Sequence, residues 1–128
     1  MKNLIVDATR DKIFLTLIVS ENIYTCSHEN SKINFEKLMI LINDFLMVNS
    51  SSLDQIDVIY VNRGPGSFAG IRNSLSIVKA INLVEKIDYY CFSFQDFFNE
   101  KKIKYENIPN ICDKFKVKKN LINPIYLS

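Results

Sequence analysis

The segment Asn62–Arg72 reads NRGPGSFAGIR and lies between an apolar run and a helical pattern. The run before it, Asp57–Val61 (DVIYV), has the β-branched and aromatic composition of a strand. The apolar spacing after it predicts a helix over Ala69–Val84. Glycine permits positive φ and close backbone approach, and proline rigidifies a turn. The segment therefore predicts a tight joint between a strand and a helix.

The same joint could bind an anion, because backbone N–H groups are exposed at the start of a helix. A P-loop ends in Gly-Lys followed by Ser or Thr, whereas Gly70 is followed here by Ile71 and Arg72. The dinucleotide pattern G-x-G-x-x-G also fails, because Gly66 and Gly70 are one residue too far apart. The spacing favours a structural turn over a phosphate-binding loop.

Three runs near the N-terminus predict further strands: Asn3–Asp7, Lys12–Ser20 and Asn22–Ser27. The polar breaks between them are short enough for hairpins, so they predict an antiparallel meander. The crossover from Asp57–Val61 through the helix to the apolar run Tyr89–Phe92 predicts a right-handed parallel βαβ unit. The fold class is therefore α/β, with helices packed on one mixed five-stranded sheet. This is the layout of a single actin-like or ribonuclease-H-like lobe.

Two predicted helices, Phe35–Val48 and Ala69–Val84, are apolar around most of their circumference. Only four residues of the first are polar, and the polar face of the second is similarly thin. A helix of this kind is usually covered on more than one side. The second cover could come from the same domain or from another chain, and the sequence leaves both alternatives open.

The C-terminal part has weaker patterns. A third, shorter helix is predicted over Ser93–Phe98, with Ser93 as its N-cap and Asp96 at the N3 position. Beyond this helix the apolar periodicity is weak, and Pro109 and Pro124 predict loops.

Charge is distributed unevenly along the chain. Residues 1–98 carry 9 basic and 11 acidic side chains, whereas residues 99–128 carry 7 lysines and 3 acidic side chains. The two balances, −2 and +4, give the formal net charge of +2. A basic tail of this kind could attract a nucleic-acid backbone or an acidic partner, or it could simply be solvated.

Chemistry-bearing residues are sparse. The single histidine, His28, has neither a second histidine at helical spacing nor clustered carboxylates, which argues against a metal site. Cys26, Cys91 and Cys112 are far apart and odd in number, as expected for reduced thiols in the cytoplasm. No apolar run approaches the ~20 residues that span a bilayer, and we identify no signal peptide. We expect no catalytic residue, metal, cofactor or membrane contact.

The glycine-rich segment resembles the GRGPGSFTGLR signature of the TsaB family, with Ala69 in place of the family's threonine. In addition, LIVDATRDKIFLTLI resembles the first hairpin of that family, SFQDFF its SSLEAL segment, and PIYL its PVYLR ending. The residues assigned to the signature turn are Arg63, Gly64, Pro65, Gly66, Ser67, Phe68, Gly70 and Arg72.

The resemblance implies a non-catalytic scaffold subunit. In the family, TsaB pairs with TsaD, the transferase that attaches a threonylcarbamoyl group to the tRNA adenosine beside the anticodon. The ATPase TsaE is a possible further partner, and contact with tRNA would arise only through the complex. The family's pairing surface is built from the first two helices. The candidate interface residues are Leu38, Ile40, Leu41, Phe45, Met47, Val48, Ile71, Leu75, Ile77, Val78 and Ile81.

Two alternative functions remain open at this stage. A free-standing homodimer would bury the same two-helix surface, because an isologous dimer and a paralogue heterodimer use the same patch. An actin-like nucleotide-binding protein or ATPase would use Asp7, which ends the first strand, where such enzymes hold a metal-coordinating carboxylate. Those enzymes bind nucleotide between two lobes, however, and Asp7 with Thr9 can instead cap the hairpin turn.

The resemblance covers residues 1–98 well and then only the last few residues of the chain. Members of the family are commonly longer, because a second actin-like lobe follows the third helix. We therefore expect residues 1–98 to form an actin-like N-terminal lobe. Residues 99–128 are expected to form a Lys-rich connection and a short terminal segment that replace the second lobe.

Overall fold

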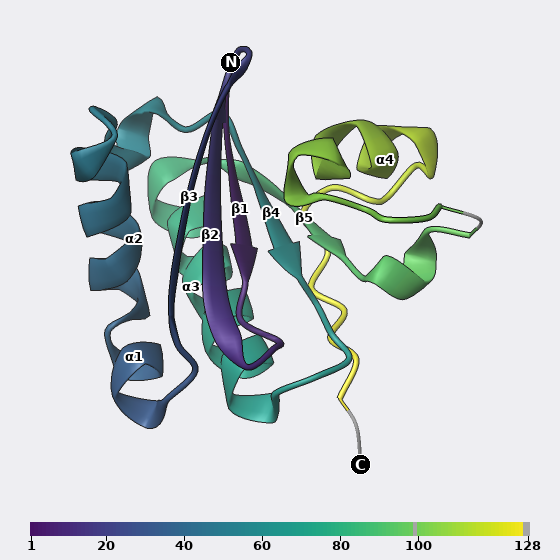
Figure 1. Cartoon of the computed structure of the whole chain (residues 1–128), viewed down its shortest axis with the longest axis horizontal. Coiled ribbons are helices and arrows are strands. Elements are labelled where there is room, and N and C mark those ends of the chain that lie inside the picture. The colour runs from purple at the N-terminus through teal and green to yellow at the C-terminus, as the bar shows by residue number, and fades with distance from the viewer. Residues whose placement is uncertain (99, 127–128) are drawn as a thin grey trace.

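The computed structural model describes residues 1–98 and 100–126 and contains one mixed sheet in the order β3-β2-β1-β4-β5 (Figure 1). The first three strands pair antiparallel, and β4 pairs parallel with both β1 and β5. The fold class predicted from the sequence is confirmed. The strands are β1 Lys2–Asp7, β2 Lys12–Val19, β3 Asn22–Glu29, β4 Val58–Asn62 and β5 Asp88–Phe92.

Alternate residues of each strand face opposite sides of the sheet, and each side has its own apolar cluster. Leu4 and Val6 of β1 contribute to one cluster, whereas Ile5 between them contributes to the other. A central strand that is buried on both faces does not alternate between apolar and polar residues, which is why β1 appears in the sequence as a continuous apolar run.

Three helices cover the first face, and one short helix covers part of the second; Figure 1 shows α1 and α2 on the opposite side of the sheet from α4. The last turn of α3 ends at Lys86, which adopts the left-handed conformation that terminates helices. The helices are α1 Lys32–Glu36, α2 Leu38–Val48, α3 Phe68–Glu85 and α4 Ile108–Lys114.

The first helical segment differs from the prediction of one helix over Phe35–Val48. The chain turns at Lys37, whose φ of −98° and ψ of 8° separate α1 from α2. The side chain of Ser31 caps α1 by accepting a hydrogen bond from the Asn34 backbone N–H at 3.2 Å. Helical hydrogen bonds continue across the turn, from the Lys37 N–H to the Ile33 carbonyl and from the Leu41 N–H to the Lys37 carbonyl. A bend that keeps its hydrogen bonds leaves no clear mark in the apolar pattern.

The C-terminal part is more ordered than the sequence indicates. The predicted helix over Ser93–Phe98 is a single 3₁₀ turn, Phe94–Asp96, closed by the expected capping box between Ser93 and Asp96. The loop predicted around Pro109 is wrong, because α4 forms there. Pro109 lies in the first turn of α4, where a missing N–H costs no hydrogen bond.

Residues 94–98 and 100–117 pack against the second face of the sheet. Ile108 and Cys112 of α4 are buried against Ile5 and Phe92, and Phe97 completes the cluster. This segment therefore covers an apolar surface of the sheet that would otherwise face water. Within the described residues no helix is long and apolar enough to cross a membrane.

Candidate partner-binding site

The glycine-rich joint is packed tightly against the end of β1. A Cβ atom added to Gly70 would lie 1.8 Å from the Ala8 carbonyl oxygen, and one added to Gly66 would lie 2.2 Å from that of Thr9. Gly64 has a φ of +110°, which strongly favours glycine. Larger residues at these positions would push α3 away from the sheet, so the glycines set the position of that helix.

The backbone donors of this joint are largely used within the protein. The Gly64 N–H donates to the side-chain oxygen of Asn62 at 2.9 Å, and the Ser67 N–H donates to the Thr9 carbonyl at 2.9 Å. The Gly70 N–H donates to the Ser67 hydroxyl at 3.1 Å. These bonds agree with the structural turn that the spacing favoured, because a phosphate-binding loop needs such donors free.

The Asp7 carboxylate is fully buried at the end of β1, beside the joint. Its Oδ1 accepts hydrogen bonds from the Thr9 N–H at 3.0 Å and the Thr9 hydroxyl at 2.7 Å. Its Oδ2 accepts from the Asn62 amide at 3.1 Å and the Tyr105 hydroxyl at 2.7 Å, with the Arg10 Nε at 3.6 Å. Burial, reinforced by the adjacent carboxylate, raises the pKa of Tyr105, which keeps that hydroxyl protonated and donating.

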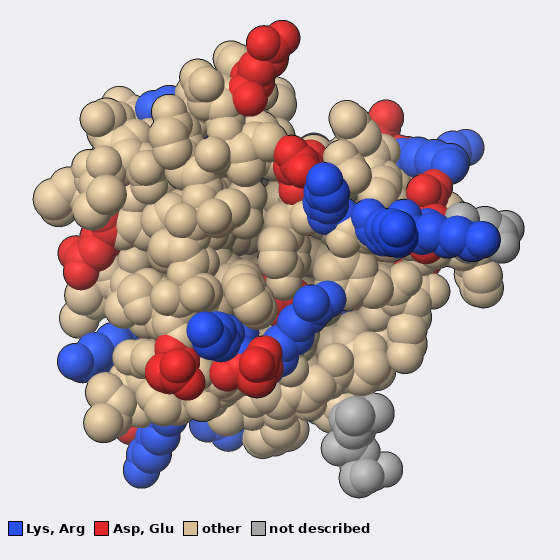
Figure 2. Space-filling view, viewed as in Figure 1, with Lys and Arg blue, Asp and Glu red and all other residues tan. Residues whose placement is uncertain are grey.

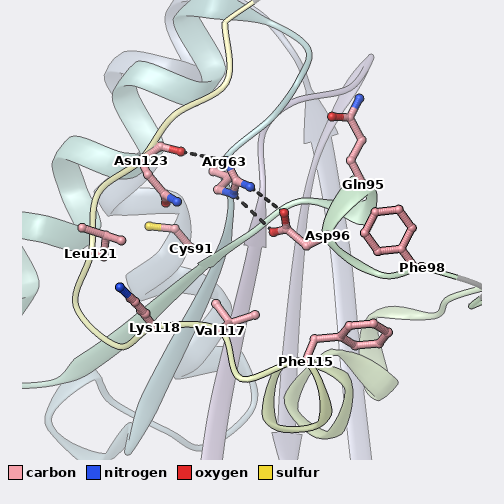
Figure 3. Close-up of a pocket in the computed structure, with 10 residues that line it drawn as sticks. All are labelled: Arg63, Cys91, Gln95, Asp96, Phe98, Phe115, Val117, Lys118, Leu121 and Asn123. Carbon is pink, nitrogen blue, oxygen red and sulfur yellow. Dashed lines mark hydrogen bonds and ion pairs between the residues drawn. The ribbon is translucent and has the colours of Figure 1, made fainter.

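Arg63 joins the glycine turn to the C-terminal segment (Figure 3). Its Nη2 and Nε donate to the two carboxylate oxygens of Asp96 at 2.5 and 3.3 Å, and its Nη1 donates to the Asn123 carbonyl at 3.1 Å. Its backbone carbonyl accepts from the Ile125 N–H at 2.8 Å. A forked guanidinium suits this three-way contact, which a lysine could not reproduce.

The remaining signature residues lie around the start of α3. The Phe68 and Tyr126 rings are 4.7 Å apart, and the Arg72 guanidinium lies 5.9 Å above the Phe68 ring. Phe68 is exposed despite its size. Pro65 follows Gly64 in a cis peptide bond and completes the turn.

The structure corrects more than half of the predicted interface. Six of the eleven candidate residues are at most 5% exposed and belong to the core between the helices and the sheet. The apolar stripe of each helix points at the sheet, so these side chains present no free surface. The six residues are Leu38, Phe45, Ile71, Leu75, Val78 and Ile81.

The other five candidates lie at or near the surface of the helices. Met47 and Val48 are 72% and 82% exposed, and Ile40 is also exposed, while Leu41 and Ile77 are half-buried against the core. These five positions keep their place in the predicted interface.

Between the two long helices runs an apolar groove of about 290 Å³, here called the α2–α3 groove. Its accessible walls are Met39, Leu53, Ile77, Ala80 and Val84, with Glu85 at one end. Val84 is 76% exposed and Leu83 beside it is also exposed, yet neither was among the candidate residues. Both residues could have been found from the sequence, because they are apolar positions outside the main apolar stripe of the predicted helix Ala69–Val84.

The geometry defines a class of protein: one ribonuclease-H-like α/β lobe with a glycine joint buried against its first strand. A family model described as "TsaD: tRNA N6-adenosine threonylcarbamoyltransferase" matches residues 28–112, more than half of the chain. The chain belongs to this family and is of the TsaB type.

The individual relatives agree with this assignment. The chain is 35% identical over 65 residues to the "tRNA threonylcarbamoyladenosine biosynthesis protein TsaB" of Buchnera aphidicola subsp. Baizongia pistaciae, covering 44% of this chain and 29% of the relative. It is 26% identical over 98 residues to the protein of the same name in Buchnera aphidicola subsp. Schizaphis graminum, covering 77% and 47%. The chain thus spans less than half the length of the curated relatives it matches.

Solved structures share the fold. YeaZ from Pseudomonas aeruginosa superposes with a TM-score of 0.66 at 20% identity, covering 72% of this chain and 43% of YeaZ. The RuvC structure from Thermus thermophilus superposes with a TM-score of 0.52 at 11% identity, covering 92% and 82%. The similarity to RuvC extends over most of both chains and agrees with the ribonuclease-H-like sheet.

Proposed function

We propose that this chain is a non-catalytic subunit that binds a TsaD transferase and supports threonylcarbamoyl modification of the tRNA adenosine beside the anticodon. Two relatives carry names from threonylcarbamoyladenosine biosynthesis, and the matching family model is named for the transferase. The proposal transfers this role to a chain that is much shorter than its relatives.

The observation that carries the proposal is the exposed apolar surface of α2 and α3. Val84 lines the α2–α3 groove and is mostly exposed, and Met47 and Val48 present further apolar surface at the end of α2. Exposed apolar patches on small domains commonly mark contact sites for other proteins. A groove between two helices suits an amphipathic helix of a partner, with apolar side chains at i, i+3 and i+4 entering the groove.

A supporting role is favoured over catalysis because three candidate reactive groups, Asp7, Cys91 and Cys112, are buried. Asp7 has protein donors on both oxygens, which leaves little capacity for a metal ion. Burial raises the pKa of the Cys91 thiol to about 11 and that of Cys112 to about 12. A thiol that stays protonated at neutral pH is a poor nucleophile.

The test is a direct binding measurement with TsaD from the same organism. We expect calorimetric titration to give a saturable 1:1 complex with a dissociation constant in the micromolar range or tighter, equivalent to about −8 kcal/mol or better. Threonylcarbamoyl transfer to tRNA by that TsaD should rise when the chain is added. Absence of binding at 100 µM, with transfer unaffected by the chain, would refute the proposal.

A pair of matched variants locates the surface. Val84→Glu places a charge on the groove wall and should weaken TsaD binding at least tenfold, because the carboxylate must be desolvated. Ile23→Glu makes the same type of change at an exposed position of β3 and should leave binding unchanged. Thermal unfolding of both variants controls for folding. Equal binding by both variants would place the interface elsewhere.

The homodimer alternative uses the same groove and is tested with the same variants. Sedimentation equilibrium without TsaD measures self-association, and Val84→Glu should abolish any dimer formed through the groove. A dimer that persists in Val84→Glu would have a different interface.

A further inference from the structure

A second cavity lies beside β5, between the turn that follows this strand and the C-terminal segment (Figure 3). Its volume is about 600 Å³, within the range of small-ligand sites. Phe98 and Phe115 line one side of it, and Arg63 and Asp96 lie deeper inside. The Phe98 ring is 77% exposed, although most phenylalanines of the described residues are wholly or partly buried.

Cationic side chains lie on two sides of this cavity. Lys118 lines the side away from Phe98 and Phe115 (Figure 3), and the Lys114 ammonium lies 5.5 Å from the centre of the Phe115 ring. Lys101 and Lys102 are exposed just beyond Phe98. In Figure 2, lysine and arginine side chains gather over the side of the molecule formed by α4 and the segment before it.

Acidic groups in the described residues offset part of these charges, and Glu106 and Asp113 are also exposed in this segment. Glu100 pairs with Lys114 at 2.5 Å and Asp88 pairs with Lys119 at 3.5 Å. Within residues 1–98 and 100–126, Lys101 and Lys118 have no carboxylate at ion-pair distance. Positive charge of this kind attracts phosphate groups and releases their counterions.

Polar groups deeper in the cavity could contact the edge of a planar ligand. The Oδ1 atom of Asn123 is buried and accepts no hydrogen bond within the described residues. Gln95 and Asp96 also line the cavity, and Asp96 is held in place by Arg63. A buried acceptor without a donor costs free energy, which a ligand N–H could recover.

We propose that this cavity binds an unpaired nucleotide of a single-stranded nucleic acid. The base stacks on Phe98 and Phe115, while Lys118 contacts the adjoining phosphate. Aromatic side chains beside a cationic groove are the general means by which proteins bind single strands without reading their sequence. The lysines continue beyond the cavity to Lys101 and Lys102, so more than one phosphate can be contacted. The inference does not depend on the proposed binding of TsaD.

Fluorescence anisotropy of the isolated chain tests the site. The probes are fluorescein-labelled 12-nucleotide RNA and DNA strands of one unstructured sequence, with a hairpin duplex and AMP as competitors. We expect single strands to bind with a dissociation constant of about 1–100 µM at 50 mM salt. Neutralising about three phosphates should weaken binding roughly 20-fold between 50 and 200 mM salt. The hairpin and AMP should compete at least tenfold more weakly than the unlabelled strand.

Three variants assign the binding to the cavity. Phe98→Ala removes one stacking surface and should weaken binding at least fivefold. Lys118→Gln should weaken it severalfold and make the salt dependence shallower by about 0.7 in the logarithmic slope. Lys79→Gln removes the same charge from the exposed face of α3, outside the cavity, and should have no effect. Phe98 and Lys118 are exposed, so their variants should fold, which thermal unfolding checks.

Several results would overturn the proposal. One is absence of binding to both strands at 500 µM protein and 50 mM salt. Another is equal weakening by Lys79→Gln and Lys118→Gln with no effect of Phe98→Ala, since this would mean attraction by net charge alone. Equal competition by AMP and the unlabelled strand would assign the cavity to free nucleotides, and equal competition by the hairpin would exclude recognition of an unpaired base.

Discussion

The two faces of the sheet are covered in different ways. On the first face, α1, α2 and α3 pack a continuous aliphatic cluster that includes Leu38, Leu46 and Val78. On the second face, one short helix, single turns and extended segments cover a smaller cluster. The second cover is fixed by polar contacts between distant residues, such as the bond from Tyr105 to Asp7. One face is thus held by apolar burial, and the other depends strongly on a few specific tethers.

The two faces also differ in the surfaces they leave exposed. The helices of the first face pack on the core cluster, and apolar residues on their outer sides, such as Met47 and Val84, are exposed. The larger cavity lies beside β5 and is lined by Phe98, Phe115 and Lys118. Among the described residues it shares no lining residue with the α2–α3 groove, so the proposed protein contact and the proposed nucleic-acid contact need not compete.

The largest expected effect is on the first face. Leu46→Ala removes a fully buried side chain from the cluster under α2 and should lower the free energy of unfolding by about 2–5 kcal/mol. Urea denaturation measures the change. Val48→Ala, on the same helix but exposed, should change it by less than about 0.5 kcal/mol. A similar loss of unfolding free energy in both variants would mean that α2 does not bury Leu46 and expose Val48 as described.

The next effect tests the tether to Asp7. Tyr105→Phe removes a hydrogen bond to a buried carboxylate and should cost about 1.5–3 kcal/mol. Hydrogen exchange should accelerate in residues 100–126 more than in α2 or α3. Tyr24→Phe, at an exposed position of β3, serves as the control. Uniform acceleration across both faces would contradict the independence of the two covers.

A smaller effect is expected from the second tether. Arg63→Lys keeps the charge but loses the forked contact with Asp96 and the bond to Asn123, which should cost about 1 kcal/mol. The change should appear as faster hydrogen exchange around residues 121–126, with the melting temperature lowered by a few degrees. Lys79→Arg on α3 should change neither quantity.

Alkaline pH should lower the stability of the protein, with little effect near neutrality. Burial raises the pKa of Tyr60 and of Cys112 on the second face, each to about 12. Because these folded-state values exceed the unfolded ones, the unfolded chain loses its protons first. Stability should therefore be constant below about pH 8 and fall as the pH rises from 9 to 12. Unfolding monitored at successive pH values measures this decline, and a gain in stability over that range would contradict it.

The sequence predicts the fold correctly where the spacing of apolar residues defines the strands and helices. The meander from Asn3 to Ser27 and the parallel unit around α3 follow from short apolar runs, polar breaks and one glycine-rich joint. These signals are local, and the joint lies between a strand and a helix that are both recognisable on their own.

The sequence does not predict contacts between residues that are distant along the chain. Nothing near Tyr105 indicates that its hydroxyl meets Asp7, and α4 was missed because Pro109 indicates a loop unless it occupies the first helical turn. The interface prediction failed for residues such as Leu75 and Val78 because an apolar residue on a helix that is apolar nearly all round can face either the sheet or the solvent. Only the packing of the whole domain decides between them.

The bond between Tyr105 and Asp7 also has a consequence for the order of folding. The two residues are 98 positions apart, so Asp7 leaves the ribosome long before its tyrosine partner is made. Until then the carboxylate can be hydrated, and the second face of the sheet is open to water. The helix face can assemble from residues 1–92 earlier, because domains begin to fold during synthesis. Closure of the second face must wait for the last quarter of the chain, and contacts over such separations form slowly.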